Sequence, residues 1–268
     1  MSVELIGSEK TVQSVFNDRY IDMYEKSHNR TDKLQNLKRR GSEGKTGQQV
    51  VEVHFPDGKL NNLSVCQMIH LYYNAEIVNC DRLIIKHDGG HKEIIHRRLL
   101  NVCEAHNGNW FAASNVICMI GNDQRRPDAG AWFQWLSYDE LHEPIKNCCI
   151  PPDLWFEVFY NKDPDQENAL EKIDMVQRDL DAIFNIEFVA IALPDERSPF
   201  RGNPNPETIS ILANQTGQNT RPYLAPYLIH WNANNIPVYY IISWNRHIVL
   251  RCGVILHFNI ILDIISKP

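Results

Sequence analysis

The stretch Leu-Trp-Phe-Glu-Val-Phe-Tyr, at residues 154–160, decides the fold class of this sequence. It is short and rich in aromatic residues, and both of its alternating faces are apolar except at Glu157. A strand with two apolar faces is typical of the middle of a sheet that is covered on both sides. The stretch therefore predicts a central strand in a fold that combines helices with a sheet.

The sequence after this strand predicts a helix and then a second strand. Asp163 suits the N-cap, Pro164 suits the first helical position, and Gln166 completes a capping-box pattern. The helix is expected to run to about residue 184, and residues 188–193 then predict an apolar strand. Such a unit predicts a right-handed crossover between parallel strands. The expected buried stripe of the helix consists of Ala169, Ile173, Val176, Leu180 and Ile183.

The sequence before this unit predicts several shorter elements. Each is bounded by turn residues and follows either the helical or the alternating hydrophobic period. The expected elements are a strand over residues 48–55, a helix capped by Ser64 and continuing through Tyr73, extended or hairpin structure over 76–85, a helix over 91–106 and a strand over 110–120.

The domain organisation expected from the sequence is an N-terminal helix and basic linker over residues 1–47, followed by one domain over 48–268. The linker is consistent with a solvated connector, a nucleic-acid contact or a nuclear-import signal. Residues 194–224 are rich in Pro, Asn and Gly and predict a long surface loop. Residues 225–265 predict an added β-rich region, with a hairpin turn between Asn232 and Asn235.

Composition limits the class of protein. The 268 residues are 43% hydrophobic, which is typical of a globular chain with a sizeable core. The formal net charge of −6 does not indicate binding to nucleic acid through bulk charge, so such binding would need a local basic patch. The seven cysteines include no Cys-x-x-Cys spacing, so a disulfide framework or zinc ribbon is not expected.

The expected location is intracellular, either cytoplasmic or nuclear. Residues 1–20 contain charged residues and no long apolar run, so they do not predict a signal peptide. No stretch reaches the roughly 18–20 apolar residues of a membrane span, and no membrane partner is expected.

Glu157 is the residue that points to chemistry. A carboxylate in the middle of an apolar strand is costly to bury unless it is paired, protonated or bound to a metal. Asp128 begins another short apolar run, which is expected to lie beside the strand that carries Glu157. Two converging carboxylates repel each other unless a cation lies between them, and Mg²⁺ or Mn²⁺ prefers such oxygen ligands.

Lys172 is the third candidate. It lies at the edge of the apolar stripe of the predicted helix, from where its side chain is expected to reach back over the strand bearing Glu157. A lysine at such a site can orient an attacking water and offset phosphate charge.

These residues occur in segments that resemble a known family. The segments are Arg126-Pro127-Asp128, the run from Pro152 to Val158, and the helical lysine downstream. Together they resemble the Uma-two-like restriction endonuclease family of the PD-(D/E)XK nuclease superfamily, over about residues 76–194. The resemblance implies a restriction-endonuclease-like α/β (α+β) fold, with a central mixed sheet flanked by helices.

The resemblance also implies an activity, which is metal-dependent hydrolysis of nucleic acid, with DNA as the favoured substrate. It implies Asp128 and Glu157 as metal ligands, Lys172 as the displaced lysine of the motif, and Glu76 as a further acidic ligand. The expected cofactor is Mg²⁺ or Mn²⁺. Assembly into a homodimer is consistent with the resemblance.

The sequence is also consistent with a second class of function. The superfamily's lysine ordinarily lies two positions after the glutamate, where this sequence has Phe159. Together with the acidic net charge and the added C-terminal strands, this favours a catalytically inactive interaction or effector module as the alternative.

Each candidate residue also has a structural explanation. Asp128 can cap a turn, Glu157 can pair with an arginine, and Lys172 can be a solvated helix residue. A zinc site at His87, His91 and His96 is not favoured, because Gly89-Gly90 breaks the helix that their spacing needs.

Overall fold

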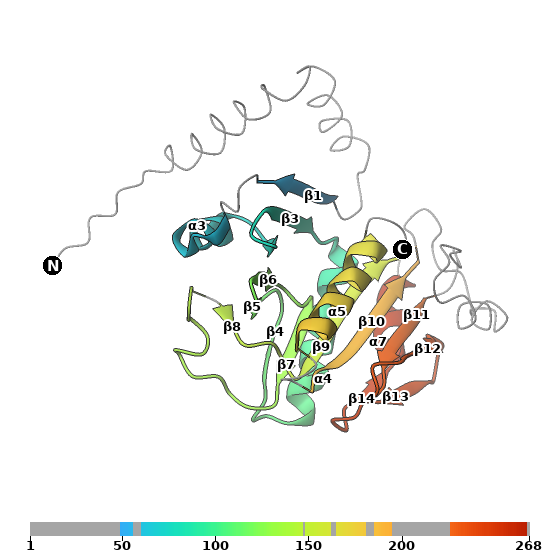
Figure 1. Ribbon diagram of the computed structural model, residues 1–268. Coiled ribbons are helices and arrows are strands. Elements are labelled where there is room, and N and C mark those ends of the chain that lie inside the picture. The colour runs from blue at the N-terminus through green and yellow to red at the C-terminus, as the bar shows by residue number, and fades with distance from the viewer. Residues whose placement is uncertain are drawn as a thin grey trace, which may run out of the picture. The chain divides into compact units, whose positions relative to one another are not determined.

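The strand predicted from residues 154–160 is β9 (Leu154–Tyr160), and it is buried along its whole length in the computed structural model. It lies in a six-stranded sheet with the order β12-β11-β10-β9-β7-β4 (Figure 1). On one side β10 (Glu187–Leu193) pairs with it in parallel, and on the other β7 (Ala129–Trp132) pairs with it antiparallel. The parallel pairing confirms the predicted strand–helix–strand unit.

The structure describes residues 49–55, 60–146, 148–161, 165–180, 185–194 and 226–266. The predictions for residues 1–47, for the cap at Asp163 and for the surface loop after residue 194 therefore lie outside the described residues. None of the helices in the described ranges has the length and apolar character that crossing a bilayer requires.

A second six-stranded sheet has the order β1-β3-β2-β6-β5-β8. The predicted mixed α/β fold class is confirmed, and its strands form two large sheets with a small two-stranded sheet in the C-terminal region. The strands of the second sheet are β1 (Gln49–His54), β2 (Ala75–Val78), β3 (Arg82–His87), β5 (Ile117–Ile120), β6 (Asp123–Arg125) and β8 (Cys148–Cys149).

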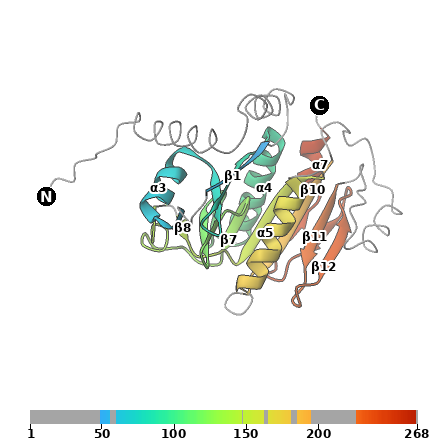
Figure 2. The same cartoon turned by 45° about the horizontal axis from the view of Figure 1, so that its top comes forward.

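The sheet that contains β9 is extended by β11 (Tyr227–Trp231) and β12 (Pro237–Ile241), which pair antiparallel beyond β10 (Figure 2). The turn between them lies at Asn232–Asn235, as predicted, where the Asn235 backbone N–H donates to the Asn232 carbonyl (2.9 Å). At its other edge the sheet ends with β4 (Phe111–Ala113).

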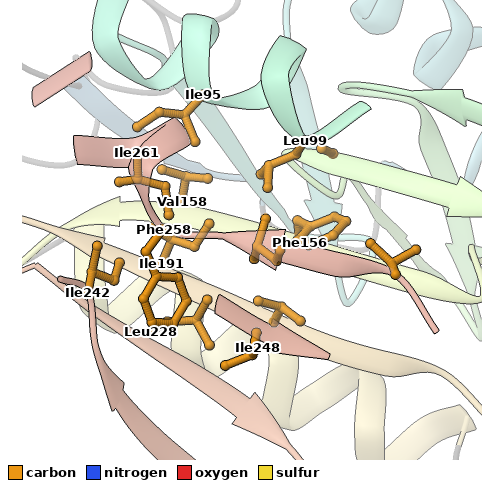
Figure 3. Packing of buried hydrophobic residues seen from close by; sticks show 14 of the residues in the cluster. Ile95, Leu99, Phe156, Val158, Ile191, Leu228, Ile242, Ile248, Phe258 and Ile261 are labelled. Carbon is orange, nitrogen blue, oxygen red and sulfur yellow. The ribbon is translucent and has the colours of Figure 1, made fainter. Parts of the chain in front are cut away.

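Two helices pack against the two faces of β9. Phe156 and Val158 share an apolar cluster with Ile95 and Leu99 of α4 (Gly90–His106), as Figure 3 shows. The alternate residues of β9, among them Phe159, pack instead with the stripe of α5 (Asp165–Leu180). Among the described side chains of that stripe, the predicted Ala169, Ile173 and Val176 are buried.

Two local predictions are corrected. The cap of α3 (Leu63–Tyr72) is Asn62 and not Ser64, because the Asn62 carboxamide oxygen accepts from the Ser64 backbone N–H (2.9 Å). The single strand predicted over residues 110–120 is two strands, β4 and β5, in different sheets. The chain turns between them at Asn115, whose φ of 57° lies in the left-handed region.

The region predicted to be β-rich over residues 225–265 ends in a helix. After β13 (His247–Val249) and β14 (Ile255–His257), α7 covers Asn259–Ile265. Phe258, Ile261 and Leu262 are buried in the cluster with α4. These positions follow a helical spacing, which a short apolar run does not distinguish from a buried strand.

Candidate functional site

Glu157 lies at the centre of a buried charged cluster on β9. Its side chain has no solvent exposure. Its Oε1 accepts a hydrogen bond from the Trp155 indole N–H (2.8 Å) and lies 2.7 Å from the Lys172 ammonium. The carboxylate is therefore paired, as its burial requires.

Lys172 reaches Glu157 from α5, as its helical position predicts. Its Nζ also donates to Glu76 Oε1 (2.8 Å) and to the main-chain carbonyl of Arg126 (2.7 Å). Phe159, at the position where the superfamily that the sequence resembles ordinarily has its lysine, is buried in the apolar cluster beneath α5. The ammonium group therefore comes to the carboxylates from the helix, and the solvated alternative for Lys172 does not apply.

Glu76 joins the cluster from β2. Besides Lys172, it pairs with the Arg125 guanidinium (3.3 Å), and the Lys86 ammonium lies 3.8 Å away. Burial raises the pKa of the Glu76 carboxyl group, but the charges of Lys172, Lys86 and Arg125 outweigh burial and lower this pKa to about 2. Glu76 is therefore a carboxylate surrounded by cations.

Asp128 lies beside Glu157 where β7 meets β9. The register pairs Ala129 with Phe156, so Asp128 comes next to Glu157. Its Oδ2 accepts the Val158 backbone N–H (2.7 Å). Burial raises the pKa of Asp128, but the nearby charges, with His96 and Lys172 first among them, bring this pKa well below its usual range.

The two oxygens of Glu157 differ in their surroundings. Oε2 is buried and has no hydrogen-bond partner, and its nearest cation is the Lys86 ammonium at 3.9 Å. Burial, together with the negative charge of Asp128, raises the pKa of Glu157 to about 7, although Lys172 and Lys86 act in the opposite direction. The site thus contains a carboxylate oxygen without a donor.

A second group of ligand atoms adjoins Asp128. Atoms of Asp88, His96 and Asp128 lie within 4.8 Å of one another, close enough to hold a metal ion. His96 comes from the buried face of α4, and neither of its ring nitrogens has a hydrogen-bond partner. Its Nε2 lies 3.8 Å from Asp128 Oδ2. His96, one of the three histidines considered for zinc, belongs to this group.

Lys92, on α4, is a further cation of the cluster. Its ammonium pairs with Asp88 (3.2 Å) and with Asp165 (3.1 Å), the first residue of α5. Asp165 in turn accepts the Tyr160 backbone N–H (2.8 Å). Among the described residues, the cluster combines the carboxyl groups of Glu76, Asp88, Asp123, Asp128, Glu157 and Asp165 with the cations Lys86, Lys92, Arg125, Arg126 and Lys172.

The structure thus brings together the four residues expected from the sequence, Glu76, Asp128, Glu157 and Lys172. Sequence reasoning missed Asp88, and it weighed His96 only for zinc. The burial of His96 could be predicted from the helical period, because positions 92, 95, 96 and 99 lie on the same, buried face of α4. Two ionisable residues on a core-facing stripe indicate a buried polar site.

Comparison with protein-family models gave no match, and comparison with curated proteins gave none. Among solved structures, the fold is similar to that of a protein from Anabaena variabilis described as "a putative nuclease belonging to DUF820", with a TM-score of 0.47 and 12% sequence identity. The similarity covers 71% of this chain and 90% of that chain.

Proposed function

We propose that this protein is a metal-dependent phosphodiesterase that cleaves nucleic acid, with DNA as the expected substrate. The observation that carries the proposal is the buried imidazole of His96. One of its nitrogens lies within 4.8 Å of carboxylate oxygens of Asp88 and Asp128, and neither ring nitrogen has a hydrogen-bond partner. A buried polar group without a partner is rare in folded proteins, and an ion bound there accounts for it.

The donor set suits a small divalent cation. Asp88 and Asp128 offer carboxylate oxygens and His96 offers an imidazole nitrogen. Mg²⁺ favours oxygen ligands, and Mn²⁺ accepts an imidazole as well. Glu157 Oε2 is a further free oxygen beside Asp128. When bound, such an ion polarises the phosphate and lowers the pKa of an attacking water.

The protein's own residues hold the site in place. Val158 fixes the Asp128 carboxylate through its backbone N–H. Lys172 keeps a positive charge against Glu157 in a buried setting, where such a charge stabilises negative charge on a phosphate more strongly than it would in water. Catalytic roles for Asp128, Glu157 and Lys172 are part of this proposal.

Glu76 has a different place in the proposal. Three cationic side chains surround it, and one of its oxygens accepts directly from Lys172. This favours a role in positioning Lys172. The prediction that Glu76 itself binds the metal stays a prediction.

The test is a nicking assay. Supercoiled plasmid is incubated with the full chain and Mg²⁺ or Mn²⁺, with EDTA in a parallel sample. Asp128→Asn and Glu157→Gln are each expected to lower cleavage by about 10²-fold or more, because each removes a carboxylate that would hold the ion. Asp174→Asn, which changes an exposed carboxylate on α5, is the matched control.

Circular dichroism and thermal unfolding show whether each variant is folded. Cleavage that resists EDTA, or that both folded variants retain, contradicts the proposal.

One observation favours the second candidate function, a nuclease-like fold without catalysis. Lys172 already pairs with both Glu76 and Glu157, so much of the buried charge is balanced within the protein. If the folded protein neither cleaves DNA or RNA nor binds Mg²⁺ or Mn²⁺ in a calorimetric titration, this reading replaces the nuclease.

A further inference from the structure

A pocket of about 330 Å³ adjoins the charged cluster, bounded by α3, the β4–β5 connection and residues 141–146. Its size falls in the range of roughly 300–1,000 Å³ that is typical of ligand sites. Among the described residues that line it, every ionisable one is basic, and Phe111 also lines it. The basic residues are His70, Arg126, His142 and Lys146.

Arg126 presents a pre-organised guanidinium to this pocket. Its N–H groups donate to the main-chain carbonyls of Ala75 (2.9 Å) and Asn115, and its Nη2 lies 3.0 Å from His70 Nδ1. Within the described ranges no carboxylate lies within ion-pair distance of it. A fixed guanidinium without a carboxylate partner suits a phosphate group.

His70 holds Arg126 as a neutral imidazole. Burial lowers the pKa of His70 to about 4. Its Nε2 lies 2.6 Å from the Gln124 carboxamide oxygen, so this nitrogen carries the proton. Nδ1 is then free to accept from Arg126.

Two exposed aromatic side chains lie next to residues that line the pocket, and we call these two side chains its rim. Trp135 is 66% exposed and its ring lies 5.9 Å from that of Phe111. Tyr138 is 76% exposed and its ring lies 4.3 Å from that of His142. Each therefore contacts a ring that lines the pocket. Exposed aromatic rings next to cations are the elements with which proteins bind single-stranded nucleic acid.

We infer that the pocket and its rim bind a segment of single-stranded nucleic acid. A phosphate lies against Arg126 and Lys146, and neighbouring bases stack on Trp135 and Tyr138. The inference rests on the proposed function and names its substrate class. The bound segment would lie close to the charged cluster, because the Arg126 carbonyl accepts from Lys172 and Asp128 follows two residues later.

The loop around the pocket carries acidic residues, so the basic surface does not extend beyond the pocket. Asp139, Glu140 and Glu143 are exposed in the same loop, and none of them lines the pocket. The Glu140 carboxylate accepts the Ser137 backbone N–H (2.7 Å). Acidic neighbours repel phosphates outside the pocket, which favours binding of a strand at one place over coating of the surface.

Binding is tested by fluorescence anisotropy with a labelled single-stranded oligonucleotide and the full chain in EDTA, so that no metal-dependent cleavage occurs. The single strand is expected to bind more tightly than the same sequence as a duplex. Trp135→Ala and Tyr138→Ala are each expected to weaken binding about tenfold, because each removes one stacking surface. Lys146→Glu, in the lining of the pocket, is expected to weaken it as well.

Matched controls lie elsewhere on the surface. Trp244→Ala removes a partly exposed tryptophan outside the pocket, and Arg97→Glu reverses an exposed charge on α4. Both are expected to bind as the wild type does. The inference is wrong if the rim variants behave like these controls, or if the duplex binds equally well.

A further arm uses a nucleoside monophosphate as competitor. The monophosphate is expected to displace the oligonucleotide only weakly, since it offers a single base. If it instead displaces the oligonucleotide fully at a concentration similar to that of the oligonucleotide, and Trp135→Ala does not change this displacement, the pocket binds a free nucleotide. That result overturns the inference that it binds a strand. Because binding is read without metal, its failure is distinguishable from failure of the nicking assay.

Discussion

Lys172 provides the positive charge closest to two buried carboxylates, those of Glu76 and Glu157. Its ammonium group lies within 2.8 Å of one carboxylate and 2.7 Å of another, and its side chain is 1% exposed. Lys172→Met leaves Glu76 and Glu157 facing each other without this cation. Breaking a buried ion pair in this way costs about 3–5 kcal/mol, so the free energy of unfolding in urea at neutral pH is expected to fall by that amount.

The double variant Lys172→Met/Glu157→Gln is the control for that prediction. It removes the carboxylate that lies closest to Lys172 (2.7 Å) and is expected to regain part of the lost stability, whereas Glu76 keeps its contacts with Arg125 and Lys86. An unfolding free energy equal to that of the wild type in Lys172→Met would contradict the role assigned to this ion pair.

His96 allows metal binding to be separated from packing. In EDTA, His96→Leu is expected to change the Tm little, because losing the interaction with Asp128 at 3.8 Å is offset by removing a buried imidazole that has no hydrogen bonds. With Mn²⁺ present, the wild type is expected to gain in Tm through ligand binding, and the variant to gain much less. Thermal unfolding with and without metal measures both effects. A large loss of stability in EDTA would identify His96 as a structural residue.

At the scale of elements, Glu187 joins β10 to its neighbours. Its carboxylate accepts the Arg251 backbone N–H (2.6 Å) after β13 and lies 2.7 Å from His230 Nε2 on β11. Burial raises the pKa of Glu187, but the His230 and Arg251 hydrogen bonds hold it below its ordinary value of 4.5. The first residue of a central strand is thus anchored to two later segments.

This lowered pKa predicts how stability depends on pH. A carboxyl group whose pKa is lowered by folding adds stability above its unfolded pKa, and this is lost as the pH falls through its folded pKa. The difference in unfolding free energy between the wild type and Glu187→Gln is therefore expected to be constant above about pH 5 and to shrink below pH 4.5. Urea unfolding of both proteins over a series of pH values measures this difference in free energy.

Glu104→Gln, an exposed carboxylate on α4, is the matched control and is expected to differ little from the wild type at any pH. A difference between wild type and Glu187→Gln that grows as the pH falls would exclude this account of the Glu187 contacts.

For the whole molecule, the contrast between a net charge of −6 and one small basic pocket predicts weak dependence on salt. Each phosphate neutralised on a single strand contributes about −0.7 to the slope of log affinity against log salt. With Arg126 and Lys146 as the contacts, the slope for single-stranded DNA is expected to be about −1 to −2. Anisotropy titrations at several salt concentrations provide this slope. A value steeper than about −4 would require a wider basic surface than the pocket offers.

The fold class follows from local patterns in the sequence. The two apolar faces of residues 154–160 predict a central strand, and the apolar stripe at Ala169, Ile173 and Val176 predicts the helix beside it; both are present. The errors occur where a local pattern is ambiguous. Residues 110–120 are strand-like throughout, yet Asn115 divides them between two sheets.

The candidate site was only partly predictable. Glu157 was conspicuous because its neighbours in sequence are apolar, and Asp128 because it opens an apolar run. Lys86 directly follows the apolar run over residues 83–85, and Asp88 precedes Gly89-Gly90; solvated residues are common at such positions, so nothing local indicates that either is buried. Their part in the cluster depends on how β3 and α4 approach β9.

The sequence by itself determined the elements and their inward faces, because hydrophobic period, capping and turn residues act over a few neighbouring positions. Tertiary structure alone decided the division into two sheets, the contact of Lys172 with both Glu76 and Glu157, the unpartnered His96 beside Asp128, and the basic pocket at Arg126. These features join residues far apart in the chain, and the cost of burying a charge depends on what the folded chain places next to it.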